Sequence, residues 1–508
     1  MKIFVTAVLF FILNVGVLAD PGPSLQAQGD SVQFPTFFSF YRYLYQAYEH
    51  STGQVLFHPS ERYGLSSAAF SRASGDWRTF QMPGSSRHYQ VSSKGAYRLN
   101  KVRLIGEFGY QRRQDDSLGW MLKPDQHDRS PYYLANKKAG NWDAHTYLVS
   151  GAGSLPVAGP MYFTAGARLN LGTYGRFTDP RPEISRYRLR LSGGLGYRYQ
   201  KLALAISAVY GYGDEQNHVG YASEINRTIG RQEYILQDIM GYGYYRRVGS
   251  NLSLNEENRK KGLEMAVRVG RFNFSYVTEQ SEREYFRRAS VSGQENDVLS
   301  VGDVFQKSHS LKATYFWGNQ QIKRLLGLDV CIENTRDFNH LILKGNNYRG
   351  NILSVRPAYQ IKKGNWEYHI GSGFERENRK DGTAAVDYLV QTASLAIGGG
   401  KLFSLKNSYL KLDVETSYRT DAGSRLLIES QYNEFMKGVV LPDFTFYSSE
   451  QFSQYVSFGY GFKTNEVVLM PSFSFNLVKP INAQDEPEAE FLTGDNRIIF
   501  SFSLNIHM

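Results

Sequence analysis

The chain has 508 residues and a formal net charge of +10, and its mean hydropathy of -0.42 is too polar for a protein that crosses a membrane with helices. Its 36 tyrosines, 32 phenylalanines and 48 glycines favour strands and turns. A single cysteine, Cys331, excludes an intrachain disulfide and a thiolate metal cluster. The positive charges are dispersed, which argues against a nucleic-acid partner and favours attraction to anionic solutes or to lipopolysaccharide phosphate.

The N-terminus has the pattern of an export signal. Lys2 precedes a long apolar run that ends in small residues, as in a secretory signal peptide. We expect residues 1–19 to be removed, with cleavage after Ala27 or an uncleaved anchor helix as alternatives. Residues 20–60 are predicted to be a periplasmic leader or plug, in which the aromatic stretch 37–50 forms a short helix, a plug or an added strand.

Residues 61–508 repeat the pattern of a β-strand. Apolar and aromatic residues take every second position, most clearly over 187–199 and 201–212, which only Gln200 separates. Because side chains alternate between the two faces of a strand, each segment has an apolar and a polar face. Each is long enough to cross a bilayer, which takes about 9–11 tilted residues. Other clear segments are 102–110, 161–171, 263–269, 272–276, 311–317, 326–332, 353–361, 366–374, 410–418, 452–462, 467–477 and 498–508; weaker ones are 63–70, 89–99, 145–153 and 386–397.

The connections between these segments alternate in length. Short turns are expected at Asn100, 155–160, Gln200, 270–271, 318–323, 362–365 and 463–466. Long segments are expected at 111–144, 172–186, 213–261, 279–306, 334–349, 419–451 and 478–496. Outer-membrane barrels have short periplasmic turns and long extracellular loops. We therefore predict an all-β fold, a transmembrane antiparallel β-barrel of roughly 18 strands with 16 as the alternative, and place both chain ends in the periplasm.

The polar faces of the segments carry an uneven charge. Basic side chains lie on early and middle segments, at Arg103, Arg168, Arg188, Arg190, Arg198, Lys201, Arg268 and Arg356. Acidic side chains lie on later ones, at Asp329, Glu333, Glu367, Glu375, Asp413 and Glu415. These groups are expected to face the lumen, where they set up a transverse field that orients charged solutes or pair into salt bridges that fill the interior. A lumen of this width needs water or a plug.

Aromatic residues fall into two groups. Tyrosine and tryptophan near the segment ends, such as Tyr110, Tyr199, Tyr276, Trp317 and Trp366, are predicted to form membrane-interface girdles. Aromatic residues of the expected loops are better candidates for contact with a ligand or partner: Trp77, Tyr132, Tyr133, Trp142 and Phe444.

Signatures of catalysis are weak. The ten histidines are scattered, and no HExxH, GxSxG or paired-cysteine motif occurs. His369 lies near Glu367 and Glu375, but same-face residues of a strand are about 7 Å apart, too spread for one metal ion. Gly398 to Gly400 are expected to form a turn. We expect no enzymatic activity, no cofactor and no metal.

Three short motifs carry a resemblance. Residues 130–133 (SPYY), 140–142 (GNW) and above all 178–182 (TDPRP) make the chain similar to a family of Gram-negative outer-membrane β-barrel proteins of unknown function. The resemblance implies a barrel in the outer membrane that is accessory to TonB-dependent uptake systems, with a TonB-dependent receptor or surface lipoprotein as a partner. Read from the residues alone, the prolines make 179–182 a rigid loop corner, where Arg181 pairs with a loop carboxylate or contacts a ligand.

The sequence therefore predicts a non-enzymatic outer-membrane barrel that transports a solute or acts as a scaffold of an uptake complex. Outer-membrane lipid and lipopolysaccharide are its expected surroundings. Two alternatives from other classes are an outer-membrane hydrolase with its site at the loop rim, for which His369 would be the first residue to mutate, and a secreted soluble β-rich binding protein.

Overall fold

The computed structural model describes residues 39–508 except 61, 126–127, 229–231, 250–251, 292–293, 320, 465–466, 484–486 and 508. The predicted signal peptide and residues 20–38 of the predicted leader lie outside the described residues. Among the residues described, no helix has the length and apolar character needed to span a bilayer.

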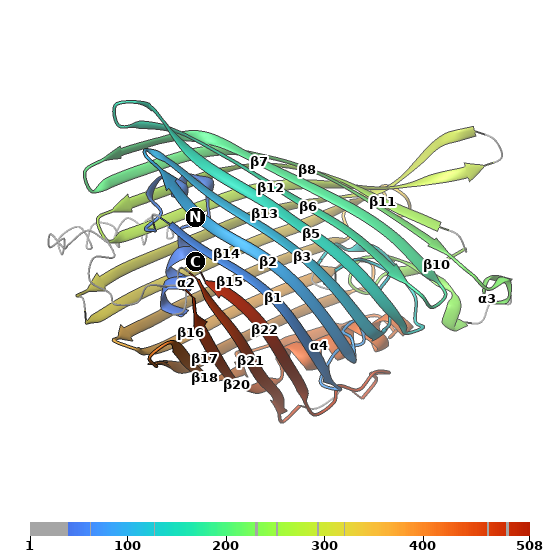
Figure 1. Cartoon of the computed structure of the whole chain (residues 1–508). Helices are drawn as coiled ribbons and strands as arrows, with labels where there is room; N and C mark the ends of the chain where they lie inside the picture. Colours follow the sequence, from blue (N-terminus) through green and yellow to red (C-terminus); the bar gives the residue numbers. More distant parts are fainter. Residues whose placement is uncertain are drawn as a thin grey trace.

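A single antiparallel sheet closes into a barrel of 18 strands, as predicted (Figure 1). Each barrel strand pairs with the next along the chain, and the first pairs with the last to close the sheet. A further short strand, β19 (Arg425–Ile428), pairs only with β17. The barrel strands are β1 (Arg62–Gly75), β2 (Ser85–Leu99), β3 (Val102–Leu118), β5 (Gly140–Ala158), β6 (Met161–Arg176), β7 (Arg181–Tyr199), β8 (Leu202–Gly220), β11 (Leu252–Val269), β12 (Phe272–Val291), β13 (Gln294–Gly318), β14 (Ile322–Asn339), β15 (Tyr348–Lys363), β16 (Trp366–Asp381), β17 (Val386–Ser404), β18 (Ser408–Asp421), β20 (Glu450–Lys463), β21 (Val468–Ile481) and β22 (Arg497–His507).

The hairpin of β7 and β8 shows how the alternation sets the two faces of the wall. Gln200 forms the tight turn, with a positive φ of 51°. Leu195 and Ile206 are opposite each other and point outward, with 59% and 53% of their surfaces exposed. Arg190, on the other face, points into the barrel and bonds interior carboxylates. The outer wall is thus apolar and the inner wall polar, as expected for a barrel surrounded by lipid.

Two predicted turns are wrong. Residues 155–158 continue β5, and the turn follows at 159–160. Gly398 to Gly400 lie within β17, and the turn after it is at 405–407. These glycines make room for inward side chains: a Cβ on Gly398 would lie 2.4 Å from the His369 ring, and one on Gly400 would lie 2.2 Å from the Asp413 carboxylate.

Many strands are longer than predicted at the end that carries the long loops, which we call the long-loop end. The predicted loop 279–306 is largely the extended pair of β12 and β13. Beyond the apolar band both faces of a strand are polar or mixed, so the alternation that reveals a strand disappears there.

The segments between strands close the two ends of the barrel. At the short-turn end, α2 (Ser39–Ala47) and η3 (Thr52–Phe57) lie inside the wall. At the long-loop end, loops fold inward as a three-stranded sheet and several short helices. These are β4 (Tyr132–Ala135), β9 (Leu236–Met240), β10 (Tyr245–Val248), α3 (Glu224–Thr228), η4 (Gln232–Tyr234), the π-helix η5 (Met436–Val440) and α4 (Leu441–Ser448).

Because adjacent residues of β22 lie on opposite faces of the wall, we expect them to differ in how well they tolerate substitution by a charged residue. Phe502 lies outward, opposite Phe70 and Phe473 and 53% exposed, whereas Ser501 lies inward. Phe502→Arg should lower the free energy of unfolding in lipid vesicles by about 2–4 kcal/mol, because it puts a charge against hydrocarbon. Ser501→Arg is the control and should change it much less. Urea titration followed by tryptophan fluorescence measures both, and an equal loss in the two variants would contradict the assigned faces.

Candidate functional site

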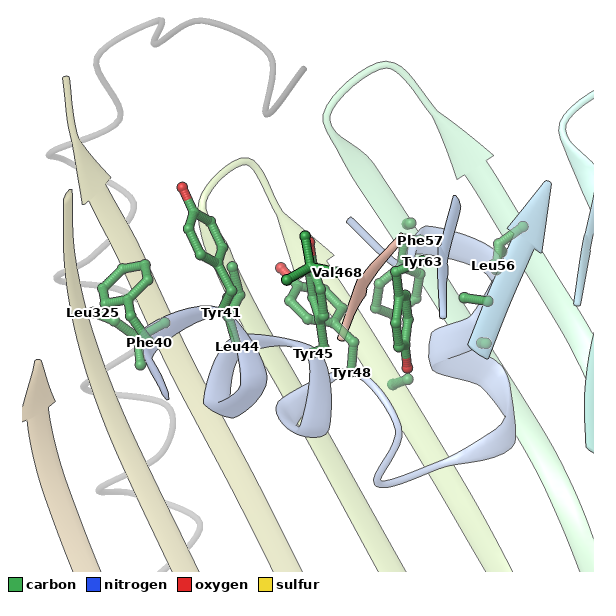
Figure 2. Packing of buried hydrophobic residues seen from close by; sticks show 14 of the residues in the cluster. Phe40, Tyr41, Leu44, Tyr45, Tyr48, Leu56, Phe57, Tyr63, Leu325 and Val468 are labelled. Atoms are coloured by element: carbon green, nitrogen blue, oxygen red, sulfur yellow. The ribbon is translucent and has the colours of Figure 1, made fainter. Parts of the chain in front are cut away.

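A small aromatic core closes the short-turn end of the barrel. Phe40 and Leu44 of α2 and Tyr48, which follows the helix, are each about 1% exposed, and Leu56 and Phe57 of η3 are buried beside them. Figure 2 shows this cluster, which includes wall residues such as Leu325 and Val468. We call residues 39–58 the inner segment. Its burial indicates that it is an integral part of the barrel interior.

Wall side chains hold the inner segment by its backbone. The Glu367 carboxylate accepts the N–H groups of Ser39 at 3.1 Å and Phe40 at 2.8 Å, the first residues of α2. Glu264 accepts the N–H of Thr52 at 2.7 Å, at the start of η3. Carboxylates at these positions bind the otherwise unpaired N–H groups of a helix start.

The end of the inner segment is held by arginines. Arg268 donates to the carbonyl oxygen of Phe57 at 2.9 Å, Arg198 donates to that of Leu56 at 3.4 Å, and Arg103 donates to that of His58. Thus four of the charges that were predicted to face the lumen, Arg103, Arg198, Arg268 and Glu367, bind the inner segment.

Two further contacts lie midway along the inner segment. His50 is hydrogen-bonded between the hydroxyls of Ser275 and Ser310, each at 2.8 Å. Burial lowers the pKa of His50 to about 4, so this ring is neutral at physiological pH. Glu49 pairs with Lys94 and accepts the Tyr63 hydroxyl. The segment is therefore fixed along its length.

The remaining predicted lumen charges mostly pair with close neighbours. Arg190 bridges Glu264 at 2.6 Å and Glu279 at 2.7 Å. The other pairs join Arg188 to Glu256, Arg168 to Glu107, Arg356 to Glu375, Lys312 to Asp329, Lys411 to Asp413 and His369 to Glu415. Glu333 lies on the same inward face of β14 as Asp329. Most of the interior charges are therefore compensated by a neighbour of opposite sign.

Several charged side chains of the interior are accessible to a water-sized molecule. The inward side chains of Arg356 and Arg168 are 65% and 55% exposed, and Glu375 and Glu415 are 44% and 42% exposed. Such exposure inside a closed wall requires open space beside these groups. The barrel therefore holds a charged, water-accessible interior between its two closed ends.

At the long-loop end, two wall carboxylates hold the infolded loops. Asp381 accepts the N–H groups of Tyr242 at 2.7 Å and Tyr244 at 2.9 Å, and Asp337 accepts the Tyr132 hydroxyl at 2.7 Å. Neither carboxylate was predicted as an interior residue, because β14 and β16 extend beyond the predicted segments 326–332 and 366–374. Asp337 lies an even number of residues after Asp329, and Asp381 lies an even number after Glu375, so each shares the inward face of its strand. This spacing is the sequence signal that could have identified them.

The loop residues predicted to contact a ligand or partner are mostly buried. Trp77 is 1% exposed and packs against Phe446, with ring centroids 4.8 Å apart. Tyr132 and Tyr133 of β4 are buried, and Phe444 of α4 is partly buried against Tyr388. Trp142 is also buried, but it lies on the barrel strand β5 and not in a loop as expected.

The 178–182 motif has a visible local role. Asp179 accepts the N–H groups of Ala222 and Ser223 at 3.0 Å, just before α3, and pairs with Arg181 at 2.9 Å. The Arg181 side chain is 47% exposed. This motif therefore joins two loops at the rim of the barrel.

A polar cavity of about 40 Å³ lies where the loops converge. It is large enough for a few water molecules. Burial lowers the pKa of the Lys123 amine to about 8 and raises the pKa of the Asp443 carboxyl to about 6, although nearby Arg379 opposes the latter shift. The cavity is lined by charged and phenolic groups, among them Lys123, Tyr133, Tyr242, Arg379, Asp443 and Tyr447.

The inner segment should depend on Glu367 more than on its neighbours. Glu367→Gln keeps the shape but loses the charge at the start of α2, so amide exchange over 39–47 should accelerate at least tenfold, corresponding to about 1.5–3 kcal/mol. The control is Glu375→Gln on the same strand, whose carboxylate lies 3.7–4.0 Å from its arginine partners and does not bind the segment. Hydrogen exchange with mass spectrometry measures both. Unchanged exchange in the Glu367 variant would contradict this role.

The infolded loops at the long-loop end, which we call the loop closure, should become less stable as pH rises. Asp443 on α4 accepts the Tyr242 hydroxyl at 3.1 Å. The raised pKa of the Asp443 carboxyl means that the folded state favours its protonated form. The contribution of Asp443 to the stability of the folded loops is therefore complete below about pH 4 and is lost as pH rises past about 6. The loss is on the order of 2 kcal/mol. Exchange in α4, corrected for the intrinsic rate, should therefore quicken from pH 5 to pH 7.5, and Asp443→Asn should remove this dependence.

Among solved structures, the chain is similar to the ferric yersiniabactin uptake receptor FyuA of Yersinia pestis, with 8% identity, a TM-score of 0.40, and coverage of 88% of this chain and 80% of that one. The ferric citrate transporter FecA matches with 8% identity, a TM-score of 0.40 and coverage of 88% and 79%. The ferric preacinetobactin receptor BauA of Acinetobacter baumannii matches with 8% identity, a TM-score of 0.37 and coverage of 88% and 80%.

No curated protein matches the chain significantly. A family model matches residues 51–508, which include all 18 barrel strands. The matched region begins at Ser51, directly before η3, so it also includes residues 51–58 of the inner segment. The chain belongs to the family of unknown function DUF6850.

Proposed function

We propose that this protein is a gated outer-membrane barrel that carries a polar or charged solute through its interior. The observation that carries the proposal is the combination of a charged, water-accessible interior with a closure at each end. A purely structural barrel has no need to keep guanidinium groups such as that of Arg356 in open space inside its wall.

Both closures combine an apolar core with polar contacts to the wall. The inner segment has an aromatic core and is bound through its backbone at the start of each helix and at its end. The infolded loops have apolar cores of their own and are also held by wall carboxylates that accept N–H and hydroxyl groups. Asp443 in these loops loses its stabilising contribution as pH rises, so we expect the long-loop end to open first.

Interior charge suits a solute that carries groups of both signs. Arg356 with Glu375 and Arg168 with Glu107 place solvent-accessible charges of opposite sign close together, with guanidinium nitrogens 3.7 Å and 3.5 Å from carboxylate oxygens. Paired charges of both signs in the interior favour polar solutes over apolar ones without selecting one sign. Separately, the predicted partnership with a TonB-dependent receptor or a surface lipoprotein, and the accessory role that goes with it, remain predictions.

Conductance in planar bilayers tests the proposal. The wild-type protein should be closed, or open only briefly, and deletion of residues 39–58 should raise its open probability, because β1 starts at Arg62 and the barrel wall is left whole. A matched control replaces Phe40, Leu44 and Tyr48 with alanine, which removes the aromatic core but keeps the backbone contacts. It should give an intermediate open probability.

Heat-dependent migration on gels verifies that each variant has a folded barrel. If the folded deletion variant conducts no better than the wild type, the proposed transport route is wrong and a scaffold role gains support. A hydrolytic activity that is lost in His369→Ala would instead support the alternative of an outer-membrane enzyme.

A further inference from the structure

Four basic side chains form a patch on the outer wall of three adjacent strands, β14 to β16, which are labelled in Figure 1. Strand parity places them outward, because their neighbours Asp337, Tyr348 and Asp381 are buried on the inward face. The members of this outer basic patch are Arg336, Arg349, Arg376 and Lys380, and all four are exposed.

The strand register places like charges side by side. Arg336 is directly opposite Arg349, and Arg349 is directly opposite Lys380. Directly opposed residues of antiparallel strands have Cβ atoms about 4.5–5.5 Å apart, and like charges there destabilise the sheet. Three opposed cations in a row therefore need compensation by negative charge.

Little of that compensation comes from the chain itself. Lys380 pairs with Asp387 at 2.7 Å, and Arg336 lies over the Phe305 ring at 5.4 Å. Within the described part of the chain, no carboxylate forms a salt bridge with Arg336, Arg349 or Arg376. An external anion would neutralise these arginines.

The position of the patch along the wall identifies the source of the anion. The outward side of β16 runs from Trp366, Tyr368 and Ile370 near the short turn to Phe374, and Arg376 and Lys380 follow. Aromatic side chains mark one interface of an apolar band about 25 Å tall, so the basic patch starts at the opposite interface. That interface belongs to the long-loop side, which is the outer leaflet in the proposed orientation.

We propose that the outer basic patch binds the phosphate groups of lipopolysaccharide in the outer leaflet. Arginine is suited to this role because its planar guanidinium donates two parallel hydrogen bonds to a phosphate. Acyl chains would lie along the apolar wall below, over Leu353 and Phe374. This inference rests on the proposed outer-membrane function, since only that membrane carries the lipid.

Native mass spectrometry of the full chain in detergent tests the proposal with bisphosphorylated lipid A as the probe. The wild type should retain lipid A, and the triple variant Arg336→Gln, Arg349→Gln, Arg376→Gln should bind it at least tenfold more weakly. The matched control, Lys363→Gln, Lys401→Gln, Lys463→Gln, removes the same number of charges near the short-turn end and should bind as the wild type does.

Two comparisons separate the possible sources of phosphate. Monophosphorylated lipid A should bind more weakly than the bisphosphorylated form, and inorganic phosphate at the same concentration should not displace it. The proposal would be overturned if the triple variant bound lipid A as tightly as the wild type does. It would also be overturned by an equal loss of binding in the control or by displacement of lipid A by inorganic phosphate. Bilayer conductance of the deletion variant needs no lipid A, so a failure here is distinguishable from a failure of the proposed transport function.

Discussion

The hydrogen bonding between β1 and β22 is the constraint on which the rest of the structure depends. Eleven residues of β22, from Arg497 to His507, are matched one for one with residues of β1. In lipid, an unpaired edge would leave backbone groups without partners, and each would cost several kcal/mol. Closure of the sheet fixes the number of strands, and with it the width of the space that the chain must fill or leave to water.

The two ends of that space are filled by different means. Near the short turns, the wall presents small residues such as Ala203, Ala205 and Ala266, against which the inner segment packs. Gly53 shows how close this approach is, because a Cβ there would lie 2.4 Å from that of Ala205. Near the long loops, apolar loop residues form cores of their own, and wall carboxylates such as Asp381 bind the loop backbone. The middle of the wall carries charged side chains that pair with one another and remain accessible to solvent.

The barrel could be predicted from the sequence because one face of each strand contacts lipid. Every second residue along the strand is therefore apolar. The sequence did not reveal how far strands such as β13 extend, because no lipid constrains that part and both faces are polar. The partners of the interior charges were also out of reach. Glu367 bonds the backbone of Phe40, 327 residues earlier, and no local pattern encodes a contact of that separation.

Loop residues were hard to place for a related reason. Trp77 and Tyr133 occur in segments that look like exposed loops, and an aromatic residue in such a loop suggests ligand contact. The structure folds these loops into the barrel mouth, where the same side chains become core. Whether a loop folds inward depends on wall residues such as Asp381, which lie far away in the sequence.

The connection between the inner segment and the barrel is very short. Only residues 59–61 separate His58 from the first residue of β1, and so few residues reach about 14 Å when extended. A segment tethered this closely stays at a millimolar effective concentration near its own binding site, even when it is released. Any opening at this end is therefore a local swing that reverses itself, with no need for a second molecule to reset it.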